Sequence, residues 1–388
     1  MRGLALEGGG ARGAYQVGVV KALYAEGITF DGFVGTSIGA INAAILAQGD
    51  LDKAIELWMG ISVDTLFDAD EQRLVRILEA EMKIDADLTL AVKKVIQGGG
   101  FNTSNMMEFL NQYLCENKIR SSGKDFGLVT FSLSERRAHE VMLEDIPHGK
   151  LVNYLMASAS FPGFNPAKID EKIFLDGAVY NNCPFDLLNG RGYEEIIVIR
   201  TNSYGVFPKI KDKHRIKTIS PKKRLGTTFS FSPENSKKNI ELGYYDGLRF
   251  AKNLCGRAYY IYPVDETELC ARLMSLNSSA ILEVGRALGV SEIYEKRMLF
   301  EKIIPQLGSY LRLDKNFNYA DFVVAVLEFA AKQRGVEPLD VYDFNQLCSL
   351  VKQLPVKEKE PNLIERLSNI DVLAKKETAV EILIDSLL

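Results

Sequence analysis

Two glycine-flanked turns lie within the first forty residues, and together they could perform acyl transfer. The first has the sequence Glu7-Gly8-Gly9-Gly10-Ala11-Arg12-Gly13, and the second has the sequence Gly35-Thr36-Ser37-Ile38-Gly39. Glycines on both sides of Ser37 would permit a strained strand-to-helix turn that exposes its hydroxyl as a nucleophile. Backbone N–H groups of the first turn would then stabilise the oxyanion of a tetrahedral intermediate.

The first turn also matches a different chemistry. Gly8, Gly10 and Gly13 fit the pattern G-x-G-x-x-G of dinucleotide-binding folds. Asp31 follows at about the distance expected of an acid that binds the ribose. Because a nucleotide fold gives no reason for the turn around Ser37, the sequence favours acyl transfer. A nucleotide-binding oxidoreductase remains the more distant alternative.

The base that would activate Ser37 is predicted to be a carboxylate. The chain has three histidines, His139, His148 and His214, and each lies in a context typical of an exposed loop or turn. Asp176 instead ends the apolar run 173–175 and precedes a glycine, which predicts a carboxylate at the end of a strand. Burial would raise the basicity of such a carboxylate, and it could take the serine proton directly. An ordinary turn aspartate is the competing interpretation.

The predicted elements place these residues in a layered α/β domain. A short buried strand precedes each turn and a helix follows it, so strand, turn and helix repeat twice. Gly18 of the first helix is expected to pack closely against the sheet, and Ser158 and Ser160 are expected to be small packing residues. The predicted strands are 4–6, 30–34, 127–133, 195–200 and a closing strand at 259–262. The predicted helices include 12–26, 38–46, 51–59, 233–254, 266–286, 292–311, 319–334, 343–354 and 362–388, with a loop at 98–100 and a linker at 355–361.

Length and composition set limits on what the site belongs to. The chain has 388 residues, 47% hydrophobic and 25% charged, which is typical of a globular protein with one large α/β domain, 1–264, and a helical region, 265–388. The net charge of −4 gives no indication of nucleic acid binding. Five scattered cysteines indicate free thiols in a reducing compartment, and three histidines argue against a structural zinc site. No metal and no organic cofactor is expected.

A third block of sequence extends the pattern of the two turns. It consists of Ala157–Phe164, followed by the segment Phe174–Pro184 that contains Asp176 and Gly177. The three blocks, in this order, resemble the patatin-like phospholipase family in its bacterial form over roughly residues 3–265. The resemblance implies a three-layer α/β/α sandwich with a C-terminal helical extension. It also implies Ser37 as nucleophile, Asp176 as base, and an oxyanion hole formed by Gly8, Gly9, Gly10, Ala11 and Arg12.

The activity implied by the resemblance is that of a lipid acyl hydrolase. Such an enzyme, of the phospholipase A or lysophospholipase type, would cleave a carboxylic ester of a phospholipid or other lipid through an acyl-enzyme. An acyltransferase or a general esterase with the same dyad is the nearer alternative. The sequence does not indicate the head group, the chain length or the oligomeric state.

A basic stretch bears on what else the protein contacts. Lys209–Arg224 contains eight Lys or Arg, and its only acid is Asp212. The stretch is most simply a solvated loop, and the alternatives are peripheral contact with an anionic membrane surface and binding of an anionic regulator. No apolar stretch reaches the eighteen residues that a membrane span requires. The expectation is therefore a cytoplasmic protein, with membrane association at the surface left open.

Overall fold

The computed structural model divides the chain into two compact units, Met1–Ala251 and Lys252–Leu388. The residues it describes are 1–68, 71–73, 75–76, 79, 101–161, 163–291, 294–357 and 370–387. The loop predicted at 98–100 and the end of the predicted linker, 358–361, lie outside these residues. The domain bounds 1–264 and 265–388 stay a prediction.

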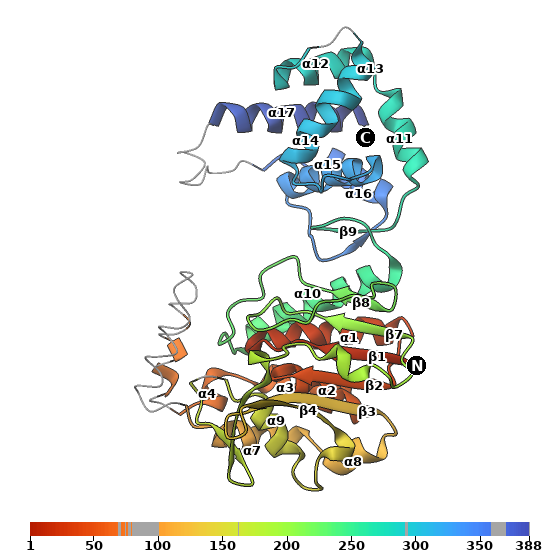
Figure 1. Ribbon diagram of the computed structural model, residues 1–388. Helices are drawn as coiled ribbons and strands as arrows, with labels where there is room; N and C mark the ends of the chain where they lie inside the picture. Colours follow the sequence, from red (N-terminus) through yellow and green to blue (C-terminus); the bar gives the residue numbers. More distant parts are fainter. Residues whose placement is uncertain are drawn as a thin grey trace. The chain divides into compact units, whose positions relative to one another are not determined.

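The first unit is built on one large sheet with eight described strands (Figure 1). Their order is β5-β6-β3-β2-β1-β7-β8, and β4 pairs with β3 beside this path. Strands β3, β2, β1, β7 and β8 run parallel, whereas β4, β5 and β6 are antiparallel to their neighbours. The bounds are β1 Arg2–Leu6, β2 Gly32–Thr36, β3 Asp125–Ser132, β4 Arg137–Met142, β5 Ala167–Ile169, β6 Lys172–Asp176, β7 Glu195–Ile199 and β8 Ile216–Ile219.

Helices and short helical turns cover the sheet. Helix α2 packs on β1, β2 and β3, and all of its residues are buried. Its many small residues permit this close packing. On another face, Ala5 and Val34 of the sheet meet Phe185 and Leu188 in a shared core. The bounds are η1 Gly10–Gly13, α1 Ala14–Ala25, α2 Ile38–Ala47, α3 Leu51–Gly60, α4 Val63–Leu66, α7 Ser104–Tyr113, α8 Glu116–Ser121, η2 Leu143–Asp145, α9 Leu151–Ser158, η3 Gly177–Val179, η4 Phe185–Leu188 and α10 Pro233–Lys252. The predicted α/β class, with a central sheet flanked by helices, is confirmed.

Helices α1 and α10 approach one another at glycines. A Cβ atom at Gly18 of α1 would overlap the backbone oxygen of Ile240, and one at Gly243 of α10 would overlap the backbone oxygen of Tyr15. The expectation that Gly18 packs against the sheet is therefore wrong, because this glycine faces α10. The tyrosine hydroxyl donates a 2.8 Å hydrogen bond to Asp246, which fixes the same contact.

The second unit has its own hydrophobic core, formed mainly by helices. Strand β9 pairs with β10, so the prediction that 259–262 closes the large sheet is wrong. The helix predicted over 266–286 is two helices, because Asn277 interrupts it and caps the second. Among the residues described in the two units, no helix is both long and apolar enough to cross a bilayer. The bounds are β9 Tyr260–Ile261, α11 Glu266–Ser275, α12 Ser278–Leu288, α13 Glu295–Met298, the π-helix η5 Leu299–Ile303, α14 Ile304–Tyr310, α15 Tyr319–Arg334, β10 Val341–Tyr342, α16 Phe344–Gln353 and α17 Ile370–Leu387.

The close contact between α1 and α10 predicts the effect of adding one methyl group. Gly18→Ala should destabilise the first unit by about 1–3 kcal/mol, because the new Cβ overlaps backbone that cannot rotate away. Chemical denaturation of the full chain measures this change. Gly60→Ala, at the end of α3, is the matched control, since its nearest neighbour, the Tyr113 hydroxyl, lies at an ordinary 3.4 Å. Equal stability of the two variants would contradict the prediction.

Candidate active site

Ser37 occupies a sharp turn between β2 and α2. The strand ends at Thr36 and the helix begins at Ile38, which leaves Ser37 alone at the junction with φ 57° and ψ −130°. Residues other than glycine rarely adopt this conformation, and it stores strain. A Cβ at Gly35 would overlap the backbone of Gly39, and a Cβ at Gly39 would overlap the Leu6 carbonyl. Both glycines are thus required for a turn this tight.

Hydrogen bonds hold the backbone of this turn in place. The Ser37 N–H donates to Ser158 Oγ at 2.9 Å, and that hydroxyl in turn donates to the Val129 carbonyl at 2.7 Å. The Thr36 hydroxyl donates to the Asn181 carbonyl at 2.8 Å. Ser158 is therefore more than the small packing residue that the sequence predicts. Its place in the third block, Ala157–Phe164, was the only signal of this role.

The strand register brings Asp176 to Ser37. Strand β2 pairs with β3 as far as Thr36 opposite Val129, and β6 pairs with β3 from Asp176 opposite Thr130. Strand β4 pairs with the same residues of β3, so β2 and β6 must share the remaining edge end to end. The Ser37 side chain consequently lies beside the Asp176 carboxylate, close enough to lower its pKa.

The environment of Asp176 makes its carboxylate a stronger base than usual. The residue is only 2% exposed, and burial raises its pKa to about 6. The hydrogen bond from the Ala178 N–H, at 2.8 Å, and the nearby Ser37 side chain oppose this rise in the pKa. A carboxylate with this pKa is ionised at neutral pH, yet it can hold a proton within a reaction cycle.

The glycine loop has fewer available N–H groups than the sequence predicts. The N–H of Gly8 donates to the Asn182 carbonyl at 3.0 Å, that of Ala11 to the Thr228 carbonyl at 2.9 Å, and that of Arg12 to the Gly9 carbonyl at 3.3 Å. Within the described ranges, the N–H groups of Gly9 and Gly10 donate to no protein acceptor. These two groups are therefore the ones available to a ligand.

Two hydroxyls fix the direction of one of these N–H groups. Thr201 Oγ1 and Ser203 Oγ each donate to the Gly8 carbonyl at 2.6 Å. A trans peptide is planar, so the N–H of Gly9 points away from the two hydroxyls. We call this pair of hydroxyls the Gly8 clamp. The sequence did not predict this clamp, because nothing near Thr201 marks a contact with a loop almost 200 residues earlier.

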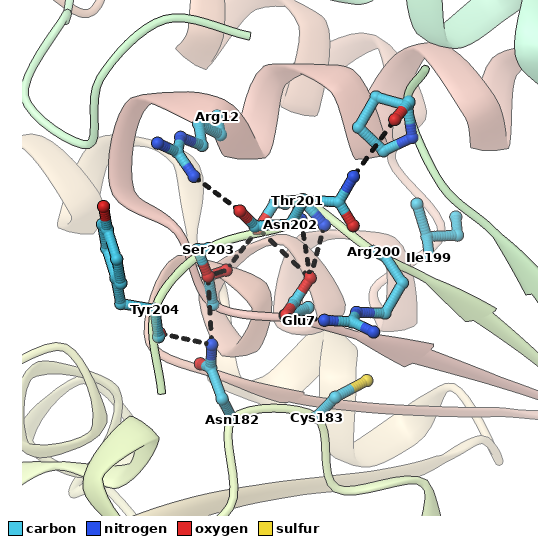
Figure 2. A network of polar contacts seen from close by, with 12 residues as sticks. Glu7, Arg12, Asn182, Cys183, Ile199, Arg200, Thr201, Asn202, Ser203 and Tyr204 are labelled. Carbon is cyan, nitrogen blue, oxygen red and sulfur yellow. Dashed lines mark hydrogen bonds and ion pairs between the residues drawn. The ribbon is translucent and has the colours of Figure 1, made fainter. Parts of the chain in front are cut away.

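The buried carboxylate of Glu7 holds the clamp in position (Figure 2). It accepts hydrogen bonds from the backbone N–H groups of Thr201, at 2.6 Å, and Asn202, at 3.0 Å. Arg200 Nη2 lies 2.9 Å from the same carboxylate, and the guanidinium stacks on the Phe207 ring at 3.6 Å. Glu7 directly precedes the glycine loop, and Arg200 directly precedes Thr201. The ion pair between Glu7 and Arg200 therefore joins the loop to the segment that carries the clamp.

An apolar cavity of about 50 Å³ adjoins Ser37. Gly10 and Ser37 line it, together with aliphatic and aromatic side chains that include Ile38, Ile41, Met106, Phe161, Phe164 and Phe229. The rings of Phe161 and Phe229 meet edge to face with centroids 5.7 Å apart. The cavity therefore offers an apolar group a place next to the serine hydroxyl.

No histidine takes part in this arrangement within the described part of the chain. His139 lies on β4, and its Nε2 is 2.6 Å from Glu135 Oε2. His148 and His214 are exposed. All three histidines thus lie outside the contacts of Ser37 and Asp176.

The position of Asp31 bears on the dinucleotide alternative. Its carboxylate accepts a 2.8 Å hydrogen bond from the N–H of Arg2, at the start of β1, whereas the glycine loop follows the end of β1. Asp31 and the loop therefore lie at opposite ends of the same strand. A dinucleotide fold requires its ribose-binding acid at the end where the phosphates bind, so Asp31 does not fit that role.

Comparisons with known proteins point to one family for the first part of the chain. Residues 4–189 match the family model described as patatin-like phospholipase. Patatin-like phospholipase domain-containing protein 7 of Rattus norvegicus is 29% identical over 205 residues, which are 52% of this chain and 13% of that protein. Lysophospholipase nte1 of Aspergillus terreus is 30% identical over 202 residues, which are 52% of this chain and 12% of that protein.

The match to the family model lies within the first unit, Met1–Ala251. Residues 4–189 form a patatin-like phospholipase domain, which confirms the resemblance seen in the sequence. The chain spans only 13% and 12% of the length of the two relatives. The crystal structure of VipD from Legionella pneumophila aligns over 100% of this chain and 90% of its own at 15% identity, with a TM-score of 0.42 too low to support any conclusion.

The raised pKa of Asp176 predicts a pH-dependent gain in stability on its replacement. An unfolded aspartate loses its proton near pH 4, whereas the folded one keeps its proton up to about pH 6, so stability falls as pH rises through this window. Asp176→Asn removes the ionisation. At pH 8 it should be more stable than the wild type by up to about 3 kcal/mol, a difference that vanishes near pH 4.

Denaturant unfolding between pH 4 and pH 8 measures this difference. The control is Asp314→Asn, which removes one charge from an exposed position and should leave the pH dependence unchanged. A variant at position 176 that is less stable than the wild type at pH 8 would contradict the assignment of a raised pKa.

Proposed function

We propose that this protein is a lipid acyl hydrolase in which Ser37 is the nucleophile and Asp176 the base. The observation that carries the proposal is the position of Ser37 beside the buried Asp176 carboxylate, next to an apolar cavity. The names of the relatives, phospholipase and lysophospholipase, support a phospholipid or lysophospholipid ester as the substrate class.

The proposed reaction has two half-reactions. Ser37 Oγ attacks the ester carbonyl carbon while its proton passes to the Asp176 carboxylate, and the resulting tetrahedral oxyanion collapses when the protonated Asp176 returns that proton to the leaving alcohol. Water then attacks the acyl-enzyme, and Asp176 takes a proton from the water and returns it to Ser37 as the fatty acid leaves. A pKa of about 6 supports both roles of the carboxylate.

The oxyanion hole in this proposal is smaller than the sequence implies. Of Gly8, Gly9, Gly10, Ala11 and Arg12, only Gly9 and Gly10 have N–H groups that are not already bonded within the described chain. Gly10 lines the same cavity as Ser37, and the Gly8 clamp fixes the peptide group between Gly8 and Gly9. We therefore assign the oxyanion to the N–H groups of Gly9 and Gly10.

The proposed dyad predicts the effect of two conservative variants. Ser37→Ala and Asp176→Asn should each lower kcat/KM for a soluble carboxylic ester by about 10³-fold or more, since each removes a group that the transition state requires. A fluorophosphonate probe should label the wild type at Ser37 and leave Ser37→Ala unlabelled. In the wild type, kcat/KM should fall tenfold per pH unit below about pH 6, where Asp176 becomes protonated.

The control for the dyad is His139→Gln, which changes a histidine that pairs with Glu135 and should keep full activity. Retained hydrolysis in Asp176→Asn would disprove the dyad. Absence of probe labelling in the wild type would disprove the serine mechanism. Adding a lysophospholipid as acceptor separates hydrolysis from acyl transfer, because an acyltransferase would form a diacyl product instead of free fatty acid.

The Gly8 clamp predicts a selective loss of turnover. Thr201→Val combined with Ser203→Ala should lower kcat by about tenfold or more and leave KM nearly unchanged. Without the clamp the N–H of Gly9 is no longer held in one direction, and this matters only in the transition state, where the oxyanion forms. Steady-state kinetics on the same soluble ester measure both constants. Thr218→Val, at an exposed position of β8, is the control. A raised KM with an unchanged kcat would instead assign the loop to substrate binding.

A further inference from the structure

A second cavity, of about 490 Å³, lies beside the glycine loop. Four cationic side chains line it, those of Arg12, Lys222, Lys223 and Arg224, together with Thr201 and Thr227. Among the described residues, no aspartate or glutamate lines it. A concave site lined by charges of one sign attracts the opposite ion more strongly than an open surface with the same charges.

Two of the cationic side chains in this cavity have no counter-ion among the described residues. Lys223 and Arg224 form no ion pair or hydrogen bond within the part of the chain that the structure describes. Arg12 is held by two carbonyl oxygens, with Nε 3.1 Å from Gly226 O and Nη1 2.8 Å from Asn202 O (Figure 2). Carbonyl oxygens orient a guanidinium without cancelling its charge, and Nη2, which has no acceptor among the described residues, can donate to a ligand.

The cationic cavity and the apolar cavity are separated by the same two chain segments. Gly10 and Thr228 line the apolar cavity, whereas Arg12 and Thr227 line the cationic one. The segments are joined by hydrogen bonds from the Ala11 N–H to the Thr228 carbonyl and from Arg12 Nε to the Gly226 carbonyl. A ligand with an apolar part and an anionic part could therefore place one on each side.

We propose that the cationic cavity binds a phosphate group. If the proposed lipid hydrolase function holds, on which this source of phosphate rests, the ligand is the head-group phosphate of the lipid whose ester reacts at Ser37. A free phosphate anion is the other source with the same chemistry. A volume of about 490 Å³ exceeds that of one inorganic phosphate and is typical of sites for organic ligands.

The structure also divides the basic stretch Lys209–Arg224 into two groups that can be tested separately. Strand β8 occupies Ile216–Ile219, so Lys222, Lys223 and Arg224 follow it and line the cavity. Lys209 and Lys211 precede the strand, are exposed and lie outside the cavity lining. The double variant Lys223→Gln with Arg224→Gln removes two charges from the cavity. Lys209→Gln with Lys211→Gln removes two from the surface.

The experiment compares two soluble esters that differ in the phosphate. Dihexanoylphosphatidylcholine and the neutral dihexanoylglycerol are both assayed as monomers, with the full chain and both double variants. We expect the cavity variant to raise KM for the phosphatidylcholine by about tenfold or more and to leave KM for the diacylglycerol unchanged. The surface variant should match the wild type on both esters. An equal loss in both variants would assign the effect to diffuse surface charge, as in membrane docking, and would overturn the proposal.

Titration calorimetry with inorganic phosphate distinguishes the two sources. For a head-group site, phosphate competes with the phosphatidylcholine and leaves turnover of the diacylglycerol unchanged. For a regulatory anion site, phosphate binds and changes turnover of the diacylglycerol itself. Unchanged ester selectivity together with equal phosphate binding by the wild type and the cavity variant overturns the proposal. If the wild type hydrolyses neither ester, the proposed function fails, and phosphate binding that is lost only in the cavity variant still supports the site.

Discussion

The candidate site depends on one edge of β3 that two strands share. Val129 ends the pairing with β2 and Thr130 begins the pairing with β6, so the ends of these two strands meet there. Backbone hydrogen bonds along β3 thus place the backbones of Ser37 and Asp176 close together, independently of side-chain contacts. A one-residue shift of β6 would turn the Asp176 side chain to the other face of the sheet.

Two features of this arrangement lower the stability of the folded state, and neighbouring hydrogen bonds offset part of that cost. The left-handed backbone of Ser37 costs about 1–3 kcal/mol, and it is held by the bond from its N–H to Ser158. Burial of the Asp176 carboxylate raises its pKa to about 6 and is opposed by the Ala178 N–H. Neither condition benefits the fold. Their occurrence together at one strand junction is typical of a functional site rather than of a packing solution.

Local patterns predicted the parts of the site that local sequence determines. Glycines on both sides of Ser37 indicated its turn, and the apolar run before Asp176 indicated the end of a strand. The Gly8 clamp could not be predicted, because Thr201 and Ser203 reach the loop through a pairing of β1 with β7 that local sequence does not encode. For the same reason the sequence did not show that Gly18 faces α10.

The glycine loop illustrates why a motif requires its surroundings before it indicates a function. In a dinucleotide fold, a helix directly after the strand directs its first N–H groups at a phosphate. Here the chain first forms the short η1 turn, and the N–H groups of Ala11 and Arg12 donate hydrogen bonds to the carbonyl oxygens of Thr228 and Gly9. Within the described residues the N–H groups of Gly9 and Gly10 have no acceptor, and Gly10 lines the same cavity as Ser37, while the Arg12 side chain extends to a separate cationic cavity. One short loop can thus serve an oxyanion on one side and a stable anion on the other.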